Sequence, residues 1–448
     1  MKKSVLLNIL IGILLIGTGA AYAQKATLVP VVSDDGTIMR KVSSNGKWAV
    51  GYTIIDAMYY KATLWNLETY EAQKLAADNQ PAGAFDVTDN GLTVVGCYNN
   101  KPAYWMNGTW TELPMPNGYV TGEVHSVNAD GSIMAGRAFT PSMGDAYACV
   151  WENGELVELN LPAKDKMGDN AYFNEIVSVS NDGNTILGCL SYNILPNRTA
   201  FLLQDGEYNM FGAEWYDPDQ GGDEYNFYDV LSMSRNGKWV TGDMYYVKEI
   251  WTNEYFCPFR YDVENDVVEL FADDAEVASF AADDFGNLFG ATPLNFPMRS
   301  AMILKNGNWT SLDAWLMTEY GLSVPEETGY DELGNVFNVS ADGKTIVGVA
   351  GLTTNNWVLK LDFVSGVNKP AQETNPMKAI VKGDHLLLNG IVSNMKVVNL
   401  QGQIVMDRNI NGEAAIFNVS QLPAGIYIVS MTDANGIVVN NKVSIGNN

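Results

Sequence analysis

A short phrase recurs along this chain and restricts its fold more than any other feature. The phrase is Ser, Thr or Asn, any residue, Asp or Asn, and Gly, with a second Gly four or five residues after the first. The first glycines are 40 to 57 residues apart. Repeats of roughly this length that are built from short strands are typical of β-propeller blades. Six copies begin at Ser43, Thr88, Asn128, Ser180, Ser234 and Ser340, and a degraded copy begins at Asp283.

Each copy predicts a hairpin. Asp342-Gly343, for example, lies between apolar runs, and Gly accepts the positive φ of a tight turn. The Ser or Thr two positions before the Asn or Asp can bond the backbone of the turn. At the second Gly, we expect a side chain to crowd a neighbouring backbone. A third and a fourth strand follow in most copies, so the sequence predicts an all-β fold with a seven-bladed β-propeller over residues 24–366.

The ends of the predicted ring are marked by a missing strand. The seventh unit has its turn at Asp342-Gly343 and a third strand near Trp357, but no fourth strand follows. The segment from Ala26 to Val31 resembles the fourth-strand phrase of other units. We therefore expect it to complete the last blade, which removes an open sheet edge.

The first residues and the overall charge indicate an exported protein. Lys2 and Lys3 precede an apolar run, and small residues around Ala23 suit cleavage, so residues 1–23 are predicted to be a signal peptide. We expect no transmembrane segment in the mature chain. The chain has 27 basic and 52 acidic residues, a formal charge of −25. Such a surface repels phosphate backbones, so we expect no nucleic-acid partner.

The C-terminal part has a different pattern. After a linker at residues 367–376, short alternating strands over residues 377–448 predict a small β-sandwich, with separate strands at His385–Leu388 and Met395–Asn399. The phrases Val397-Val398-Asn399-Leu400-Gln401-Gly402 and Leu422-Pro423-Ala424-Gly425-Ile426-Tyr427 resemble the C-terminal sorting domain of the type IX (Por) secretion system of Bacteroidota. This resemblance implies that type IX machinery delivers the chain across the outer membrane to the medium or the cell surface.

The repeats carry a second resemblance. Val-Ser-x-Asp-Gly-x-x-x-Val-Gly, followed by Ala-x-x-Trp, is similar to the bacterial extracellular repeats named HAF, which carry no known catalytic residues. This resemblance covers most of residues 25–363 and implies an extracellular scaffold.

Catalytic motifs are not found in the sequence. The two histidines, His125 and His385, fall in different predicted domains, and neither belongs to a hydrolase or metalloprotease motif. Paired loop carboxylates leave a carbohydrate-active hydrolase or lyase as an alternative. Asp217, Asp219 and Asp223 lie around a Gly-bearing bend that suits calcium, although the order of a calcium-binding loop is incomplete. The four cysteines have no metal-site spacing, and we expect buried thiols.

Aromatic residues give a more specific prediction. We assign them to long connections on one face of the ring, where Tyr and Trp suit contacts with sugars or proteins. The favoured interpretation is a non-catalytic binding or scaffold protein for an extracellular glycan or protein, with a purely structural envelope component as a further alternative. The candidate binding residues are Tyr59, Tyr60, Tyr98, Tyr119, Tyr192, Trp215, Tyr245, Tyr246 and Trp251.

Overall fold

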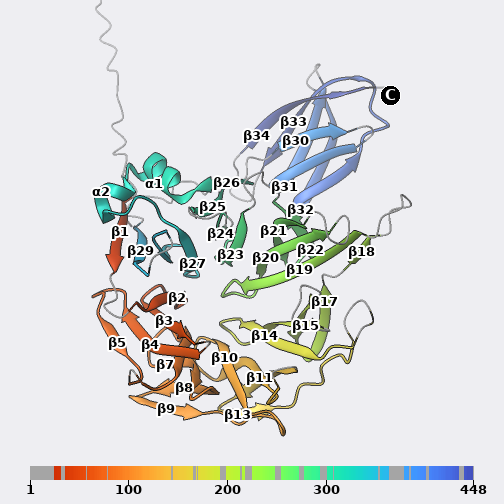
Figure 1. Cartoon of the computed structure of the whole chain (residues 1–448). Helices are drawn as coiled ribbons and strands as arrows, with labels where there is room; N and C mark the ends of the chain where they lie inside the picture. The colour runs from red at the N-terminus through yellow and green to blue at the C-terminus, as the bar shows by residue number, and fades with distance from the viewer. Residues whose placement is uncertain are drawn as a thin grey trace, which may run out of the picture. The chain divides into compact units, whose positions relative to one another are not determined.

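The protein consists of two compact all-β units. The N-terminal unit extends to Val364, and the C-terminal unit runs from Ser365 to Asn448 (Figure 1). Among the described residues, neither helix is long and apolar enough to cross a membrane. The computed structural model describes residues 25–446 apart from 32–35, 57, 78, 143–144, 165–167, 169, 192–197, 212–213, 217–223, 248–253, 272–276, 293–299, 306, 352–353, 363–377, 383–384, 400–402 and 433–437.

The N-terminal unit is propeller-like and is built from antiparallel hairpins that follow one another in chain order. The first sheets contain β2 (Ile38–Val42), β3 (Trp48–Ile55), β4 (Met58–Asn66) and β5 (Ala72–Lys74), and then β6 (Ala82–Val87), β7 (Thr93–Tyr98), β8 (Lys101–Met106) and β9 (Thr109–Glu112). An eight-stranded sheet contains β10 (Thr121–Val127), β11 (Ile133–Phe139), β12 (Ala146–Glu152), β13 (Glu155–Val157), β14 (Phe173–Val179), β15 (Thr185–Ser191), β16 (Arg198–Gln204) and β17 (Glu207–Phe211).

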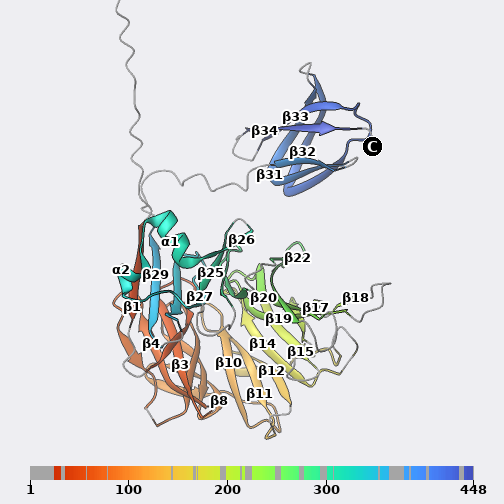
Figure 2. The same cartoon turned by 45° about the horizontal axis from the view of Figure 1, so that its top comes forward.

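The remaining sheets of this unit lead back towards the first (Figures 1 and 2). They contain β18 (Glu214–Tyr216), β19 (Glu224–Met233), β20 (Trp239–Val247), β21 (Glu254–Asp262) and β22 (Val267–Leu270), then β23 (Ala278–Ala282), β24 (Leu288–Ala291), β25 (Ala301–Lys305) and β26 (Asn308–Ser311), and finally β27 (Asn335–Val339), β28 (Thr345–Val349) and β29 (Asn356–Asp362). A single parallel pair, Ala146 and Phe173, joins the two halves of the eight-stranded sheet.

The N-terminal strand β1 (Lys25–Val31) lies at the edge of the last sheet. It pairs antiparallel with β29, so the order in this sheet is β1-β29-β28-β27. Leu28 and Val31 are buried. Trp65 of the first sheet is 1% exposed and shares a core cluster with Val347 and Val358 of the last sheet. The two ends of the N-terminal unit are therefore packed together.

The turns that carry the repeated phrase also contact one another. The backbone N–H of Ala341, in the last turn, donates to the carbonyl of Ser44 in the first turn at 2.9 Å. Asp284 donates to Ala341 at 2.9 Å, and Asn181 donates to the carbonyl of Arg235 at 2.7 Å. Within the turns, the predicted hydroxyl bonds are present: Ser340 Oγ accepts from Thr345 N at 2.9 Å.

Asp283 replaces that hydroxyl in the degraded copy of the phrase. Its carboxylate is 2% exposed and accepts from the backbone N–H groups of Phe285 and Asn287 and from Asn287 Nδ2. Burial raises the pKa of Asp283 to about 6, although these hydrogen bonds lower it. The native state thus binds this proton more tightly than the unfolded chain does. Stability should therefore fall as the pH rises from about 4 to about 6.

We expect Asp283→Asn to stabilise the N-terminal unit by about 1–2 kcal/mol at pH 7.5. A pKa raised by two units corresponds to a stability loss of roughly 3 kcal/mol when the group is ionised, and the substitution should recover part of that loss. The gain should largely disappear near pH 4, where Asp283 is protonated in the native wild type and partly protonated in the unfolded chain. Thermal unfolding followed by tryptophan fluorescence measures this, because all 11 tryptophans precede residue 365.

The matched control for this prediction is Asp182→Asn. Hydrogen bonds from Ser180 and Asn184 lower the pKa of Asp182, so its loss should reduce stability at pH 7.5. Equal shifts at pH 7.5 and pH 4 for Asp283→Asn would contradict the assignment.

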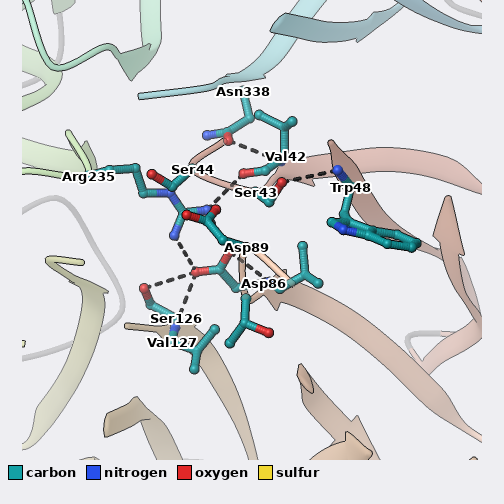
Figure 3. A network of polar contacts seen from close by, with 12 residues as sticks. Val42, Ser43, Ser44, Trp48, Asp86, Asp89, Ser126, Val127, Arg235 and Asn338 are labelled. Carbon is teal, nitrogen blue, oxygen red and sulfur yellow. Dashed lines mark hydrogen bonds and ion pairs between the residues drawn. The ribbon is translucent and has the colours of Figure 1, made fainter. Parts of the chain in front are cut away.

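A buried polar network links distant sheets of the N-terminal unit (Figure 3). Arg235, in the turn after β19, forms a bidentate ion pair with Asp86 of β6, with N–O distances of 2.7 and 3.0 Å. Arg235 Nη2 also donates to the carbonyl of Val42 at 2.8 Å. Asp86 accepts in addition from Ser126 Oγ and Val127 N, both at 3.2 Å. One carboxylate and one guanidinium thus connect the first strands of three repeats, β2, β6 and β10, with the turn that carries Arg235.

The two helices were not predicted from the sequence. Helix α1 (Leu312–Tyr320) begins after β26, and α2 (Val324–Thr328) follows it. The Ser311 hydroxyl accepts from Ala314 N at the N-cap, and Gly321 ends α1 in the left-handed conformation with φ 65°. Leu312 and Leu316 pack in the same core cluster as Trp357 and Leu28. The helices therefore cover the sheet that contains β1.

The C-terminal unit is built around one long strand. It contains β30 (Lys378–Lys382), β31 (His385–Asn399), β32 (Ile404–Asn418), β33 (Gly425–Thr432) and β34 (Val438–Ile445), in the order β30-β31-β33-β34 with β32 also paired to β31 (Figure 2). The prediction of two separate strands at His385–Leu388 and Met395–Asn399 is wrong, because register shifts between Asn389 and Asn394 let a single strand continue.

Candidate functional site

Most of the predicted aromatic residues that the structure describes lie in strands, and only Tyr119 among them lies in a connection. Tyr59 and Tyr60 belong to β4, and Tyr98 ends β7. Assigning these three to long loops was wrong, because the hairpin strands extend further than the turn signals suggest. Tyr119 precedes β10 and contacts the ring of Tyr147 at 5.7 Å.

Other predicted positions are described only in part. Trp215 lies in β18, and Tyr245 and Tyr246 lie in β20, but their side chains are not described. Tyr192, Trp251 and the candidate calcium ligands Asp217, Asp219 and Asp223 lie outside the described residues. In the described part of the chain, no three His, Cys, Asp or Glu side chains are grouped so as to hold a metal ion. Cys97, Cys149, Cys189 and Cys257 are buried thiols, as expected, and none of the four forms a disulfide.

Tyr98 forms part of a shallow groove between the first two sheets. Its ring stacks on Trp110 with centroids 5.9 Å apart and an interplanar angle of 7°. Trp110 Nε1 donates to the carbonyl of Leu75 at 2.9 Å, which fixes the indole against the first sheet. The groove has a volume of about 390 Å³ and is also lined by Lys74 and Gln80.

A β-bulge occurs at the same position in each first strand of the repeats, and sequence reasoning missed it. The bulged residue stands three positions before the Ser, Thr, Asn or Asp of the phrase and is at least partly exposed, whereas the residues on either side of it are buried or half-buried. A bulge can turn one side chain of a strand out of the layer between two sheets. We call the seven bulged residues, one from the first strand of each repeat, the axial ring. They are Arg40, Phe85, His125, Val177, Leu231, Phe280 and Phe337.

Neighbouring members of the axial ring contact one another. The guanidinium carbon of Arg40 lies 4.7 Å from the ring centroid of Phe337, although the two residues belong to the first and last repeats. Phe85 and His125 have centroids 6.1 Å apart. Tyr52 of β3 joins this wall, 5.2 Å below the Arg40 guanidinium and 4.8 Å from Phe85. Phe337, Arg40, Tyr52, Phe85 and His125 thus form a continuous arc.

A buried ionic cluster adjoins the arc at His125. Glu123 of β10 is 4% exposed and accepts from Arg137 Nε at 2.9 Å and from Arg137 Nη2 at 2.6 Å. Arg137 Nη1 also donates to Glu175 of β14, which is 6% exposed. His125 Nε2 lies 3.0 Å from Glu123, and its Nδ1 lies 2.8 Å from the carbonyl of Ile176. The neutral imidazole can donate to only one of these oxygens.

The cluster keeps Glu123 ionised. Burial raises the pKa of this carboxyl, but the hydrogen bonds from His125 and Arg137 and the positive charge of Arg137 outweigh burial and lower the pKa to about 2. Burial, and then the nearby Glu123 carboxylate, raise the pKa of Tyr59 above its ordinary value. A general acid at neutral pH needs a raised carboxyl pKa, which is the opposite arrangement. In this geometry Glu123 is therefore an ionised partner of Arg137, and Glu175 is paired with the same guanidinium.

The predicted sorting motif forms a turn and the start of a strand. Leu422 N donates to the carbonyl of Val419 at 3.0 Å, and Gly425 then begins β33. The Tyr427 hydroxyl returns to the carbonyl of Pro423 at 2.8 Å, and Tyr427 is 5% exposed in the core of the unit. Ala424 and Ile426 remain exposed.

Comparison with known proteins identifies the C-terminal unit. Residues 375–446 match the family described as secretion system C-terminal sorting domain. This match confirms the resemblance to the type IX sorting domain and implies export through the outer membrane to the cell surface or the medium. No curated protein matches the chain in sequence.

Among solved structures, this chain is similar in fold to proteins of low sequence identity. An oligogalacturonate lyase in complex with manganese has a TM-score of 0.51 at 10% identity and covers 75% of this chain and 93% of that chain. The hydrazine synthase of Kuenenia stuttgartiensis has a TM-score of 0.47 at 13% identity, with 74% and 97% covered. The β-propeller domain of the trilobed protease of Pyrococcus furiosus has 0.44 at 11% identity, with 75% and 99% covered. At such identity the likeness concerns the fold alone.

Proposed function

We propose that this chain is a type IX cargo whose N-terminal unit is a non-catalytic binding or scaffold module for a glycan or protein. The match of residues 375–446 to the sorting domain is the observation that supports export. The signal peptide at residues 1–23 would supply the preceding step across the inner membrane.

We further infer a seven-bladed propeller followed by a small β-sandwich. The seven phrase-bearing hairpins, the hydrogen bond from Ala341 to Ser44 and the position of β1 on β29 support a closed ring. In the C-terminal unit, β31 pairs with β30 through Leu386 and with β33 through Val397. Leu386, Val397 and Tyr427 share one buried cluster, which supports two layers.

The binding role is supported by the side chains of the described inner strands. The axial ring presents aromatic faces and one arginine, and the carboxylates beside it are held by Arg137. Aromatic rings with a nearby fixed polar group are the usual composition of sugar and protein contact sites. A carbohydrate-active hydrolase or lyase remains the alternative, and it would need carboxylates other than Glu123.

Export is tested by removing residues 375–446 from the chain in its own host. We expect the truncated protein to be lost from the medium and the cell surface and to accumulate inside the outer membrane, as measured by fractionation and immunoblotting. As the reciprocal control, residues 365–448 fused to a periplasmic reporter should carry that reporter outside. A truncated protein that reaches the surface as the full chain does would refute the proposal.

The binding role is tested separately on a glycan array with the purified full chain. Binding to particular glycans without release of products from them supports the module, whereas product release supports the enzyme alternative. If no glycan on the array is bound, the glycan branch of the proposal is wrong.

A further inference from the structure

Arg40 differs from the other arginines of the N-terminal unit whose side chains are described. Arg137 is paired with Glu123 and Glu175, Arg235 with Asp86, and Arg260 with Glu269. Within the described residues, Arg40 has no hydrogen-bond or ion-pair partner, and its Nε is buried without one. A buried donor without a partner costs about 1–3 kcal/mol, so a site that retains it calls for an explanation.

Arg40 is flanked by aromatic rings. Its guanidinium is stacked over Phe337 at 4.7 Å and over Tyr52 at 5.2 Å, so its donors are held at the edge of an aromatic surface. Tyr52 in turn contacts Phe85 at 4.8 Å and Tyr59 at 5.0 Å. A planar guanidinium in a fixed orientation suits bidentate binding of a carboxylate, and the adjoining rings suit the C–H face of a sugar.

Local charge at this place is compatible with an anion despite the net charge of −25. Two carboxylates adjoin the arc residues in sequence, and both are already bound: Glu123 by Arg137 and His125, and Asp86 by Arg235. Surface acidic residues beyond about 10 Å are largely screened at ordinary salt concentration. An unpaired arginine is therefore the charge that a ligand at the arc would meet.

The bulges argue against an extended peptide as the occupant. A peptide that binds to a sheet edge needs a regular row of free backbone groups. Every first strand in the repeats is interrupted by a one-residue bulge at the axial ring, as between Met39 and Lys41 in β2. Recognition at this surface must therefore use side chains.

We propose that Arg40 and the aromatic residues beside it bind the carboxylate of an acidic sugar in a glycan. This inference rests on the proposed glycan-binding function and specifies its ligand class. The carboxylate would bind the Nη donors of Arg40, because Nε is buried, and the sugar face would lie against Tyr52, Phe85 or Phe337.

The test compares uronic-acid oligosaccharides with their carboxyl-reduced counterparts, using the full chain and isothermal titration calorimetry. We expect the wild type to prefer the acidic form, and Arg40→Met to lose about tenfold to a hundredfold in affinity for it, as expected for a charged hydrogen bond. Arg40→Lys should keep only part of the wild-type affinity for the acidic form, because an ammonium group lacks the planar fork of a guanidinium. Wild-type affinity for the acidic form should fall with added salt, and that of Arg40→Met should not.

Arg260→Met is the matched control. Arg260 is also stacked on two rings, Trp239 at 5.0 Å and Phe271 at 5.3 Å, but it is paired with Glu269. Its loss should leave glycan affinity unchanged. Equal affinity of the wild type for acidic and reduced glycans, or unchanged affinity in Arg40→Met, would overturn this inference alone. Binding of acidic peptides and of no glycan would overturn both this inference and the glycan branch of the proposed function.

Discussion

Replacing Arg235 with Met is expected to destabilise the N-terminal unit by about 3–5 kcal/mol, the usual cost of removing one partner of a buried ion pair. Asp86 is 0% exposed and Arg235 is 6% exposed, so the remaining carboxylate cannot be reached readily by water. The net stability of a folded protein is only about 5–15 kcal/mol. A change of this size should be obvious in urea unfolding followed by tryptophan fluorescence.

The pH dependence of Arg235→Met gives a second readout. In the wild type, burial raises the pKa of Asp86, but Arg235 and Lys41 outweigh burial and lower it. Asp86 therefore stabilises the native state above its unfolded pKa, and this contribution is lost as the pH falls towards the lowered native pKa. Without Arg235 the native pKa should rise, so the destabilisation should be smaller at pH 4 than at pH 7.5.

Two variants separate the ion pair from general effects of the substitution. Asp86→Asn in the Arg235→Met background should restore part of the loss, because no uncompensated charge remains. Lys101→Met removes an exposed pair with Glu112, whose side chains are 43% and 41% exposed, and should cost less than about 1 kcal/mol. If Arg235→Met costs no more than Lys101→Met, the network in Figure 3 does not hold the sheets together.

The sequence predicts the hairpins well because their determinants are local. The Gly after Asp or Asn has a positive φ in each turn, as at Gly343 with φ 69°, and the hydroxyl of Ser340 bonds backbone within the same turn. The last sheet lacks a fourth strand in its own repeat, and β1 occupies that place on β29. These features depend on residues close in sequence or on a strand that is visibly missing.

The polar network and the helices could not be predicted in the same way. Arg235 and Asp86 are 149 residues apart, and nothing in either local phrase indicates the other. Ser311 and Gly321 are the ordinary start and stop signals of a helix, but they lie within a repeat whose pattern predicts only strands. In the C-terminal unit, the sequence predicts separate strands at His385–Leu388 and Met395–Asn399, where β31 continues through bulges.

The second Gly of the phrase is a sequence signal for the position of the axial ring. The second Gly of the phrase was predicted to avoid a neighbouring backbone, and this is confirmed. A Cβ on Gly51 would lie 1.8 Å from the carbonyl oxygen of Ile38, and one on Gly348 would lie 1.9 Å from that of Asn335. In both cases the carbonyl belongs to the residue two positions before the bulge, Arg40 or Phe337. The second Gly therefore marks the bulge and, with it, the axial residue.

Gly51→Ala should consequently destabilise the N-terminal unit by at least about 3 kcal/mol, at the upper end of overpacking costs. The added methyl group meets backbone, which cannot rotate away, so β2 must move relative to β3. That movement would also disturb the hydrogen bond from Met39 N to Asn356 Oδ1, which is 2.8 Å long and joins the first sheet to the last. Urea unfolding followed by tryptophan fluorescence measures the loss.

Gly108→Ala separates the steric contact from the conformational cost of replacing glycine. Gly108 has φ 85° and nothing within 4 Å of an added Cβ, so its substitution should cost only the roughly 1–2 kcal/mol of a left-handed residue. Gly51 has no positive φ, so its larger cost must come from the carbonyl of Ile38. Because β2 carries Arg40, Gly51→Ala should also weaken binding of acidic glycans at temperatures where the protein is still folded, whereas Gly108→Ala should not. Equal stability losses in the two variants would show that the bulge in β2 does not require the glycine.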